Sequence, residues 1–208
     1  MSFTLKRGLS NIFIAEVTAD TDAEFTTGTP EKLIPAGEMS VAPNSERTPY
    51  HFDNSVFAIV SREGGSELSI TGAGLRAAAI AKLNNKTVDE ATGAVFDEGV
   101  MGAVKYFALG AEKDNIDGTK ELVWFLKGTF AIPEESAKTV GEDTDASGTT
   151  LTYTAVPTVH KFAKTGKVCK RTVIDTETTT VKTEADWFAQ VVTPDNAAEI
   201  VQKAGATA

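Results

Sequence analysis

The sequence predicts a mainly β fold: an antiparallel β-sandwich or barrel with one flanking α-helix, in the all-β or α+β class. Segments rich in β-forming residues recur along the chain, turn signals separate them at short spacing, and stretches with a helical pattern are few. The chain has 208 residues, 41% of them hydrophobic, which is enough to bury a core without metals or disulfides. Because no linker or composition shift divides it, we expect a single domain over residues 1–208.

Two of the expected strand pairs carry hairpin turn signals. Gly64-Gly65 separates segments 55–61 and 67–71, and Asp117-Gly118 separates 105–110 from 122–132. The remaining expected strands are residues 11–17, 151–156 and 168–174.

Helical patterns are confined to three places. The alanine-rich segment Ala73–Asn84 favours a helix, and a short helix is expected over residues 184–190. Asp195 is a suitable capping residue for a third helix over residues 195–203.

The charge balance argues against binding to polyanions. Lys and Arg total 20 against 29 Asp and Glu, a net charge of −9. Such a surface repels nucleic acid and anionic membranes, so sequence-specific DNA recognition is not expected. The single cysteine, Cys169, excludes an internal disulfide. With no signal-peptide or membrane-helix pattern, we expect synthesis in a cytoplasm and no membrane association.

Two segments carry opposite charge. Between residues 134 and 145 the acids outnumber a single base, Lys138; they are Glu134, Glu135, Glu142, Asp143 and Asp145. Between residues 161 and 171 there are bases and no acid: Lys161, Lys164, Lys167, Lys170 and Arg171. Each segment is either a solvated loop or one of two complementary patches. Complementary patches on one subunit would favour head-to-tail contacts that close into rings or extend into fibres.

The best match to a chemical motif is Gly72-Ala-Gly74, which fits the dinucleotide fingerprint before an alanine-rich helix. That fingerprint needs a returning parallel strand, whereas residues 87–96 are expected to form a hairpin around Thr92-Gly93. A strand end and helix start explain the glycines better, so a nicotinamide-dependent enzyme is the least favoured hypothesis. Asp143 and Asp145 match half of a calcium loop, but Thr154 stands where its last carboxylate belongs, which favours a solvated turn.

No catalytic constellation is expected. The two histidines, His51 and His160, lack metal-ligand spacing, and there is no nucleophile elbow. Cys169 is expected to be a packing residue, and Trp124 and Trp187 to be core anchors. The sequence therefore predicts neither an enzyme nor a cofactor or metal site.

Several segments together resemble the major tail proteins, or tail tube proteins, of long-tailed, non-contractile bacteriophages. They are residues 5–16, 105–110, 124–135, 151–162 and 187–195. The resemblance implies a tail-tube β-sandwich with a flanking helix and a long loop or hairpin, and hexameric rings whose inner strands line a channel. It also implies rings stacked around a tape measure protein, with an initiator at the tail tip and a terminator at the head end. The protein would be assembled in the bacterial cytoplasm, become part of the virion, and let DNA pass without specific binding.

Within that role, residues 1–10 and 192–208 are expected to be arms between rings, and the acidic and basic segments to meet across a ring or subunit interface. Glu63 and Glu67, beside the expected Gly64-Gly65 turn, are candidate acids facing the channel. The alternative function is a cell-surface adhesion or carbohydrate-binding β-sandwich module. It predicts a monomer with an exposed aromatic cluster, and the absence of an export signal argues against it.

Overall fold

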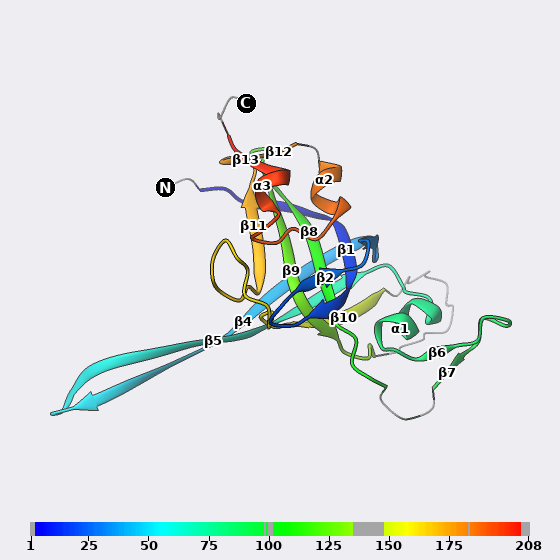
Figure 1. Ribbon diagram of the computed structural model, residues 1–208, viewed down its shortest axis with the longest axis horizontal. Coiled ribbons are helices and arrows are strands. Elements are labelled where there is room, and N and C mark those ends of the chain that lie inside the picture. The colour runs from blue at the N-terminus through cyan, green and yellow to red at the C-terminus, as the bar shows by residue number, and fades with distance from the viewer. Residues whose placement is uncertain (1–2, 98, 100–101, 135–147, 183, 205–208) are drawn as a thin grey trace, which may run out of the picture.

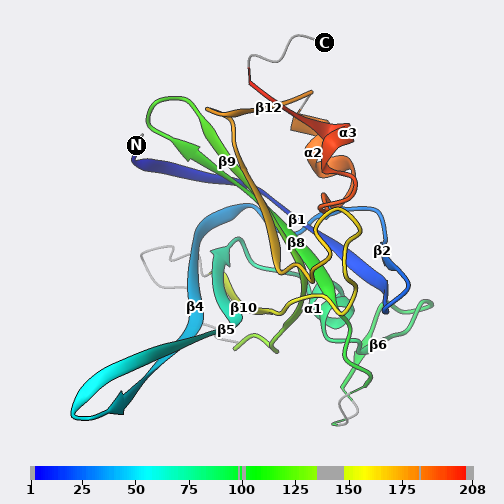
Figure 2. The same cartoon turned by 60° about the vertical axis from the view of Figure 1, so that its left-hand side comes forward.

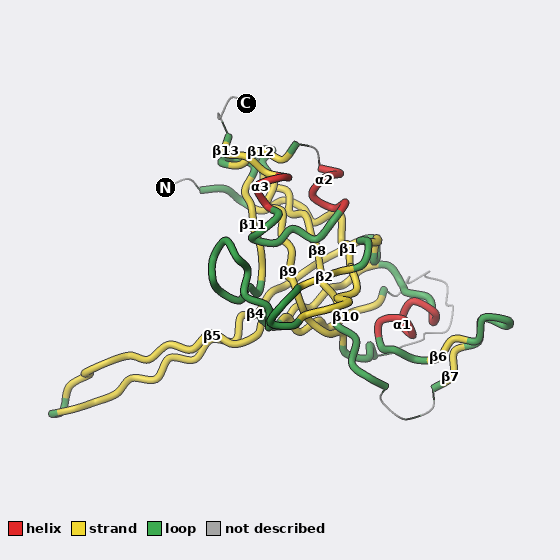
Figure 3. Tube along the Cα trace, in the orientation of Figure 1, coloured by secondary structure: helices red, strands yellow, loops and turns green. Residues whose placement is uncertain are grey.

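The computed structural model describes residues 3–97, 99, 102–134, 148–182 and 184–204, and it confirms a mainly antiparallel β fold (Figures 1 and 3). The large sheet has the order β2-β1-β8-β9-β10-β5-β4, with β3 beside β1 and β11 beside β9. Its strands are β1 (Lys6–Asp20), β2 (Phe25–Thr27), β3 (Glu31–Lys32), β4 (Ala36–Phe52), β5 (Ser55–Gly72), β8 (Phe107–Asn115), β9 (Lys120–Phe130), β10 (Thr149–Ala155) and β11 (Arg171–Asp175). The smaller elements are α1 (Ala77–Leu83), β6 (Thr87–Val88), β7 (Val95–Phe96), β12 (Thr179–Val181), α2 (Glu184–Ala189), α3 (Ala197–Ile200) and β13 (Val201–Lys203).

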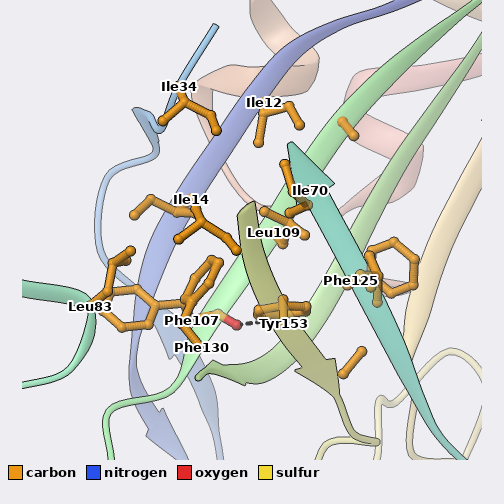
Figure 4. Close-up of a cluster of buried hydrophobic side chains, with 14 of the residues drawn as sticks. Ile12, Ile14, Ile34, Ile70, Leu83, Phe107, Leu109, Phe125, Phe130 and Tyr153 are labelled. Atoms are coloured by element: carbon orange, nitrogen blue, oxygen red, sulfur yellow. Dashed lines mark hydrogen bonds between the residues drawn. The ribbon is translucent and has the colours of Figure 1, made fainter. Parts of the chain in front are cut away.

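One core fills the concave side of the curved sheet, where side chains from β1, β5, β8, β9 and β10 converge (Figure 4). Phe130 packs between Phe107 and Tyr153, with ring centroids 5.9 and 4.9 Å away. The Tyr153 hydroxyl donates a hydrogen bond of 2.7 Å to the carbonyl of Phe107. This buried bond satisfies the only polar atom that Tyr153 brings into the core.

A second core lies on the opposite face of β8 and β9, beneath the C-terminal helices. Trp124 and Trp187 are both fully buried there, and the Trp124 indole donates to the carbonyl of Trp187 at 3.0 Å. Phe188 stacks on Phe13 of β1 with centroids 4.7 Å apart. The expectation that the tryptophans are core anchors is confirmed, and β8 and β9 are buried on both faces as a result.

Strands β4 and β5 form one long hairpin, whose outer half extends away from the body (Figures 1 and 2). The turn lies at Asp53-Asn54, where both residues have positive φ (47° and 62°), as a tight two-residue hairpin turn requires. The prediction of a turn at Gly64-Gly65 is wrong, because both glycines lie inside β5. A Cβ on Gly65 would be 2.7 Å from the carbonyl oxygen of Ala155, so this glycine allows a close approach of two strands.

The other predicted hairpins are confirmed. Gly118 has φ +84° between β8 and β9, and Gly93 has φ +72° between β6 and β7. The first helix is present but shorter than expected, and the short helix near residue 184 is confirmed as α2.

The two C-terminal segments differ from expectation. The helix expected over 195–203 is only the four residues of α3, and β13 follows and pairs with β12. Asp195 does not cap it; its carboxylate accepts the backbone N–H groups of Ala163 and Lys164. The strand expected over 168–174 begins at Arg171, so Cys169 precedes it.

Both terminal segments contact the body where they are described. β1 pairs with β8 from Lys6 onward, and Val192 and Ile200 are buried in the second core. Their predicted role as arms between rings stays a prediction. No helix in the described chain is long and apolar enough to cross a membrane.

Candidate functional site

The outer half of the β4–β5 hairpin carries more of the exposed large apolar side chains than any other element of the described chain. The ladder between β5 and β10 ends at Ser66 and Ala155, and beyond it β4 and β5 pair only with each other in the described structure. We call residues 45–62 the hairpin end. Its large apolar side chains are 50–75% exposed: Tyr50, Phe52, Val56, Phe57, Ile59 and Val60. Exposed apolar clusters of this kind mark interaction surfaces.

The side chain of Lys170 connects the base of this hairpin to the loop that precedes β11. Lys170 Nζ donates one hydrogen bond to Glu63 Oε1 at 2.6 Å and another to the carbonyl oxygen of Gly64 at 3.2 Å. The carbonyl of Lys170 accepts from Leu126 N at 2.9 Å, which anchors the lysine to β9. The hydrogen bond and charge of Lys170 lower the pKa of Glu63 below its ordinary value. Because the ladder has an extra residue at Gly64-Gly65, opposite Asn44, this contact lies beside a β-bulge, a place where a strand bends.

We expect Lys170→Met to widen the range of directions that the hairpin adopts, because the variant keeps the apolar stem and removes the cation. The measurement is the distance distribution between spin labels at Thr48→Cys and Glu177→Cys, in a Cys169→Ser background. The width of the distribution should increase, while the unfolding midpoint stays unchanged.

Lys167→Met is the matched control, since Lys167 is exposed in the same loop and no side-chain contact is seen for it in the described structure. It should leave the distribution as in the parent protein. Equal widths in Lys170→Met and the parent would show that Lys170 does not orient the hairpin.

A second surface is the face of β10, β5 and β4 that points away from the core. Leu68, Ile70, Leu151 and Tyr153 are buried, so the alternating residues face outward. We call these residues the hydroxyl face: Glu38, Ser40, Ala42, Glu67, Ser69, Thr71, Thr150, Thr152 and Thr154. The register aligns them in rows across the strands, such as Ser40, Ser69 and Thr152. This surface carries hydroxyls and carboxylates but no cation that could pair with a phosphate.

The basic segment lies in the loop between β10 and β11 and ends at Arg171, the first residue of β11, and one buried carboxylate holds the chain just before it. Asp20, at the end of β1, accepts the backbone N–H groups of Val159 and His160 at 2.9 Å and pairs with Lys127 Nζ at 2.6 Å. Burial raises the pKa of the Asp20 carboxyl, but these hydrogen bonds and the lysine outweigh it, so the pKa is lowered. Lys161, Lys164 and Lys167 are exposed along the loop, and Arg171 is exposed at the start of β11.

The structure places the predicted acids in three different settings. Glu134 is exposed just after β9, whereas Glu135, Glu142, Asp143 and Asp145 lie outside the described residues. Glu67 belongs to the hydroxyl face, and Glu63 pairs with Lys170. The extra residue at Gly64-Gly65 interrupts the strand alternation between Glu63 and Glu67, so they do not share one continuous face.

The hairpin end was not among the residues predicted to be functional. The run Ser55-Val-Phe-Ala-Ile-Val60 was interpreted as an ordinary strand of the fold. The sequence feature that marks this run is its lack of alternation between apolar and polar residues, which is typical of a strand covered on both faces. In the described part of the subunit, its large apolar side chains are exposed on both faces of the hairpin.

The sequence motifs acquire structural explanations. Gly72 ends β5, where a Cβ would lie 2.5 Å from the Pro35 carbonyl oxygen, and α1 leads into the antiparallel β6–β7 pair rather than a parallel strand. Burial raises the pKa of Cys169, whose thiol donates to the Arg171 carbonyl. In the described part of the chain, no group of three or more His, Cys, Asp and Glu side chains could hold a metal ion.

The chain matches no protein-family model, and no curated protein shows significant sequence similarity to it.

Proposed function

We propose that this chain is a structural virion protein, the subunit of a phage tail tube. It polymerises into stacked hexameric rings around a tape measure protein, between an initiator at the tail tip and a terminator at the head end. The resulting channel conducts the genome. The observation that carries the proposal is the hairpin end, an extended strand pair with apolar side chains that the subunit's own body does not cover.

The energetics favour covering this element. Burying a large apolar side chain contributes roughly 1.5–3 kcal/mol, and the hairpin end presents several that are at least half exposed. A heterologous contact between this element and a different surface of the next copy would close into rings or propagate as a tube.

The hydroxyl face suits the wall of a channel for DNA. A cation on that wall would form phosphate contacts and hold the duplex, whereas hydroxyls and the carboxylates of Glu38 and Glu67 let it slide. The net charge of −9 acts in the same direction.

Negative-stain electron microscopy over a protein concentration series tests the proposal. We expect rings or hollow tubes of uniform width, formed by the chain alone or after addition of a tail-tip complex. Monomers at every concentration, with and without that complex, would contradict it.

The aromatic part of the hairpin end supports a second candidate, a carbohydrate-binding module. Phe52 and Phe57 are in edge-to-face contact at 5.3 Å with Tyr50 exposed nearby along the strand, and sugars stack on exposed rings. This candidate predicts a monomer that binds glycans and forms no tubes.

Placing cations on the hydroxyl face is expected to convert a non-binding wall into one that holds DNA. The variant Ser69→Lys with Thr152→Lys should make assembled tubes retain short duplexes at low salt and release them at high salt. Retention is measured by co-sedimentation of labelled duplex with tubes. The control, Ser69→Asn with Thr152→Asn, should retain none, and equal retention by the two variants would show that this face does not line the channel.

A further inference from the structure

We propose that the hairpin end is covered on both faces at once, so that each hairpin inserts between two neighbouring copies of the chain. This inference rests on the proposed self-assembly and concerns its geometry.

The strand register assigns the side chains of the hairpin end to two faces. Residues directly opposite each other share a face. The first face contains the pairs Glu46 with Arg62, Thr48 with Val60, and Tyr50 with Ala58. The second contains Arg47 with Ser61, Pro49 with Ile59, and His51 with Val56.

Two contacts agree with this assignment. Glu46 and Arg62 line one hollow at the base of the hairpin. Near the turn, Phe57 is the extra residue where the register shifts, and its ring contacts Phe52. Phe52 follows Tyr50 by two residues, so both rings belong to the first face.

Large apolar side chains are exposed on each face. The first face has Tyr50, Phe52, Phe57 and Val60, and the second has Val56 and Ile59 beside Pro49. Among the described strands of the body, β8 and β9 are apolar on both faces and have a core on each, whereas β10 is apolar only towards the core. A hairpin lying on one flat surface would leave one of its apolar faces in water.

The charges and shape of the hairpin end favour copies of this chain as the occupants. The acids Glu46 and Asp53 balance the bases Arg47 and Arg62, so the hairpin end has no formal net charge and the chain's net charge of −9 lies in the remaining residues. The acidic body of a neighbouring copy therefore does not repel the hairpin end as a whole. The hairpin end extends clear of its own body, which leaves both faces accessible to neighbours (Figure 2). A symmetric pair of hairpins would cover one face of each and leave the other exposed, so two different neighbours are needed.

Thiol labelling of one reporter on each face tests the inference. Thr48→Cys reports on the first face and Ser61→Cys on the second, each in the Cys169→Ser background; both positions are exposed in the subunit. Maleimide reaction rates are compared between the free subunit and tubes. We expect both rates to fall by at least about tenfold on assembly, because reaction then needs local opening of the contact.

Protection of only one reporter in tubes would overturn the two-sided insertion and leave self-assembly standing. Tubes in which neither reporter is protected would remove the hairpin end from the interface altogether. A chain that never assembles would overturn the proposed function, and the inference with it.

Discussion

Replacing Phe57 and Val60 with serine is expected to abolish self-assembly while the subunit stays folded. Both side chains are more than half exposed on the hairpin end, and the described body packs against neither. If each contributes roughly 1.5–3 kcal/mol to a contact between copies, losing both weakens that contact about 10²-fold or more. The measurements are sedimentation velocity and electron microscopy over the same concentration series, with the unfolding midpoint as the readout of folding.

The matched control is Phe96→Ser with Val104→Ser, which removes the same kinds of exposed side chain outside the hairpin. We expect this control to assemble as the parent protein does. Equal assembly by the two double variants would refute the assignment of the contact to the hairpin end. A large fall in the unfolding midpoint of the first variant would show that its side chains support the fold instead.

Turn chemistry explains which hairpins could be predicted. Asp117-Gly118 and Thr92-Gly93 place a glycine where φ is positive, which is the physical basis of the signal. The same reasoning failed at Gly64-Gly65, where the glycines serve a close strand approach and an extra residue in the ladder. The actual turn, Asp53-Asn54, uses two non-glycine residues with positive φ, for which the sequence signal is weaker.

The candidate site was harder to predict than the fold because exposure depends on what lies opposite. The segments Val56–Val60 and Leu122–Leu126 are both apolar runs in the sequence, yet the first is in water and the second is packed on both faces. Local pattern alone does not distinguish a strand covered by its own chain from one left for a partner. Likewise, Lys170 and Glu63 were predicted to belong to different surfaces, and they pair across 107 residues of sequence.

The contacts of Asp20 could not be predicted from the local sequence either. Nothing near Asp20 in the sequence indicates that it is buried, because its partners, Lys127, Val159 and His160, are more than 100 residues away. The contact arises in the folded sheet, where β1 continues past its last partner in β8, Glu16 opposite Phe107. Asp20 thereby reaches Lys127 of β9 and the loop that follows β10.

Asp20→Ala is expected to lower the free energy of unfolding by about 3–5 kcal/mol, the cost typical of removing one partner of a buried ion pair. The Lys127 and Asp20 side chains are 11% and 5% exposed, so the variant leaves the ammonium of Lys127 largely buried without its counter-ion. Its other contact, the face of the Tyr106 ring at 4.5 Å, replaces only part of that interaction. Urea unfolding of the two proteins at neutral pH measures the difference.

The pH dependence separates the charge of Asp20 from its role as a hydrogen-bond acceptor. The pKa of Asp20 is lowered in the fold below its ordinary value of 3.8, so its contribution is complete above that value and is lost as the pH falls through the lower, folded pKa. The stability difference between parent and Asp20→Ala should therefore shrink below about pH 4.

Asp195→Ala is the control, because Asp195 also accepts two backbone N–H groups of this loop but is exposed. Its cost should be no more than about 1 kcal/mol. Equal costs for the two variants at neutral pH would show that the buried Lys127 needs no counter-ion, and that Asp20 acts only by holding the loop.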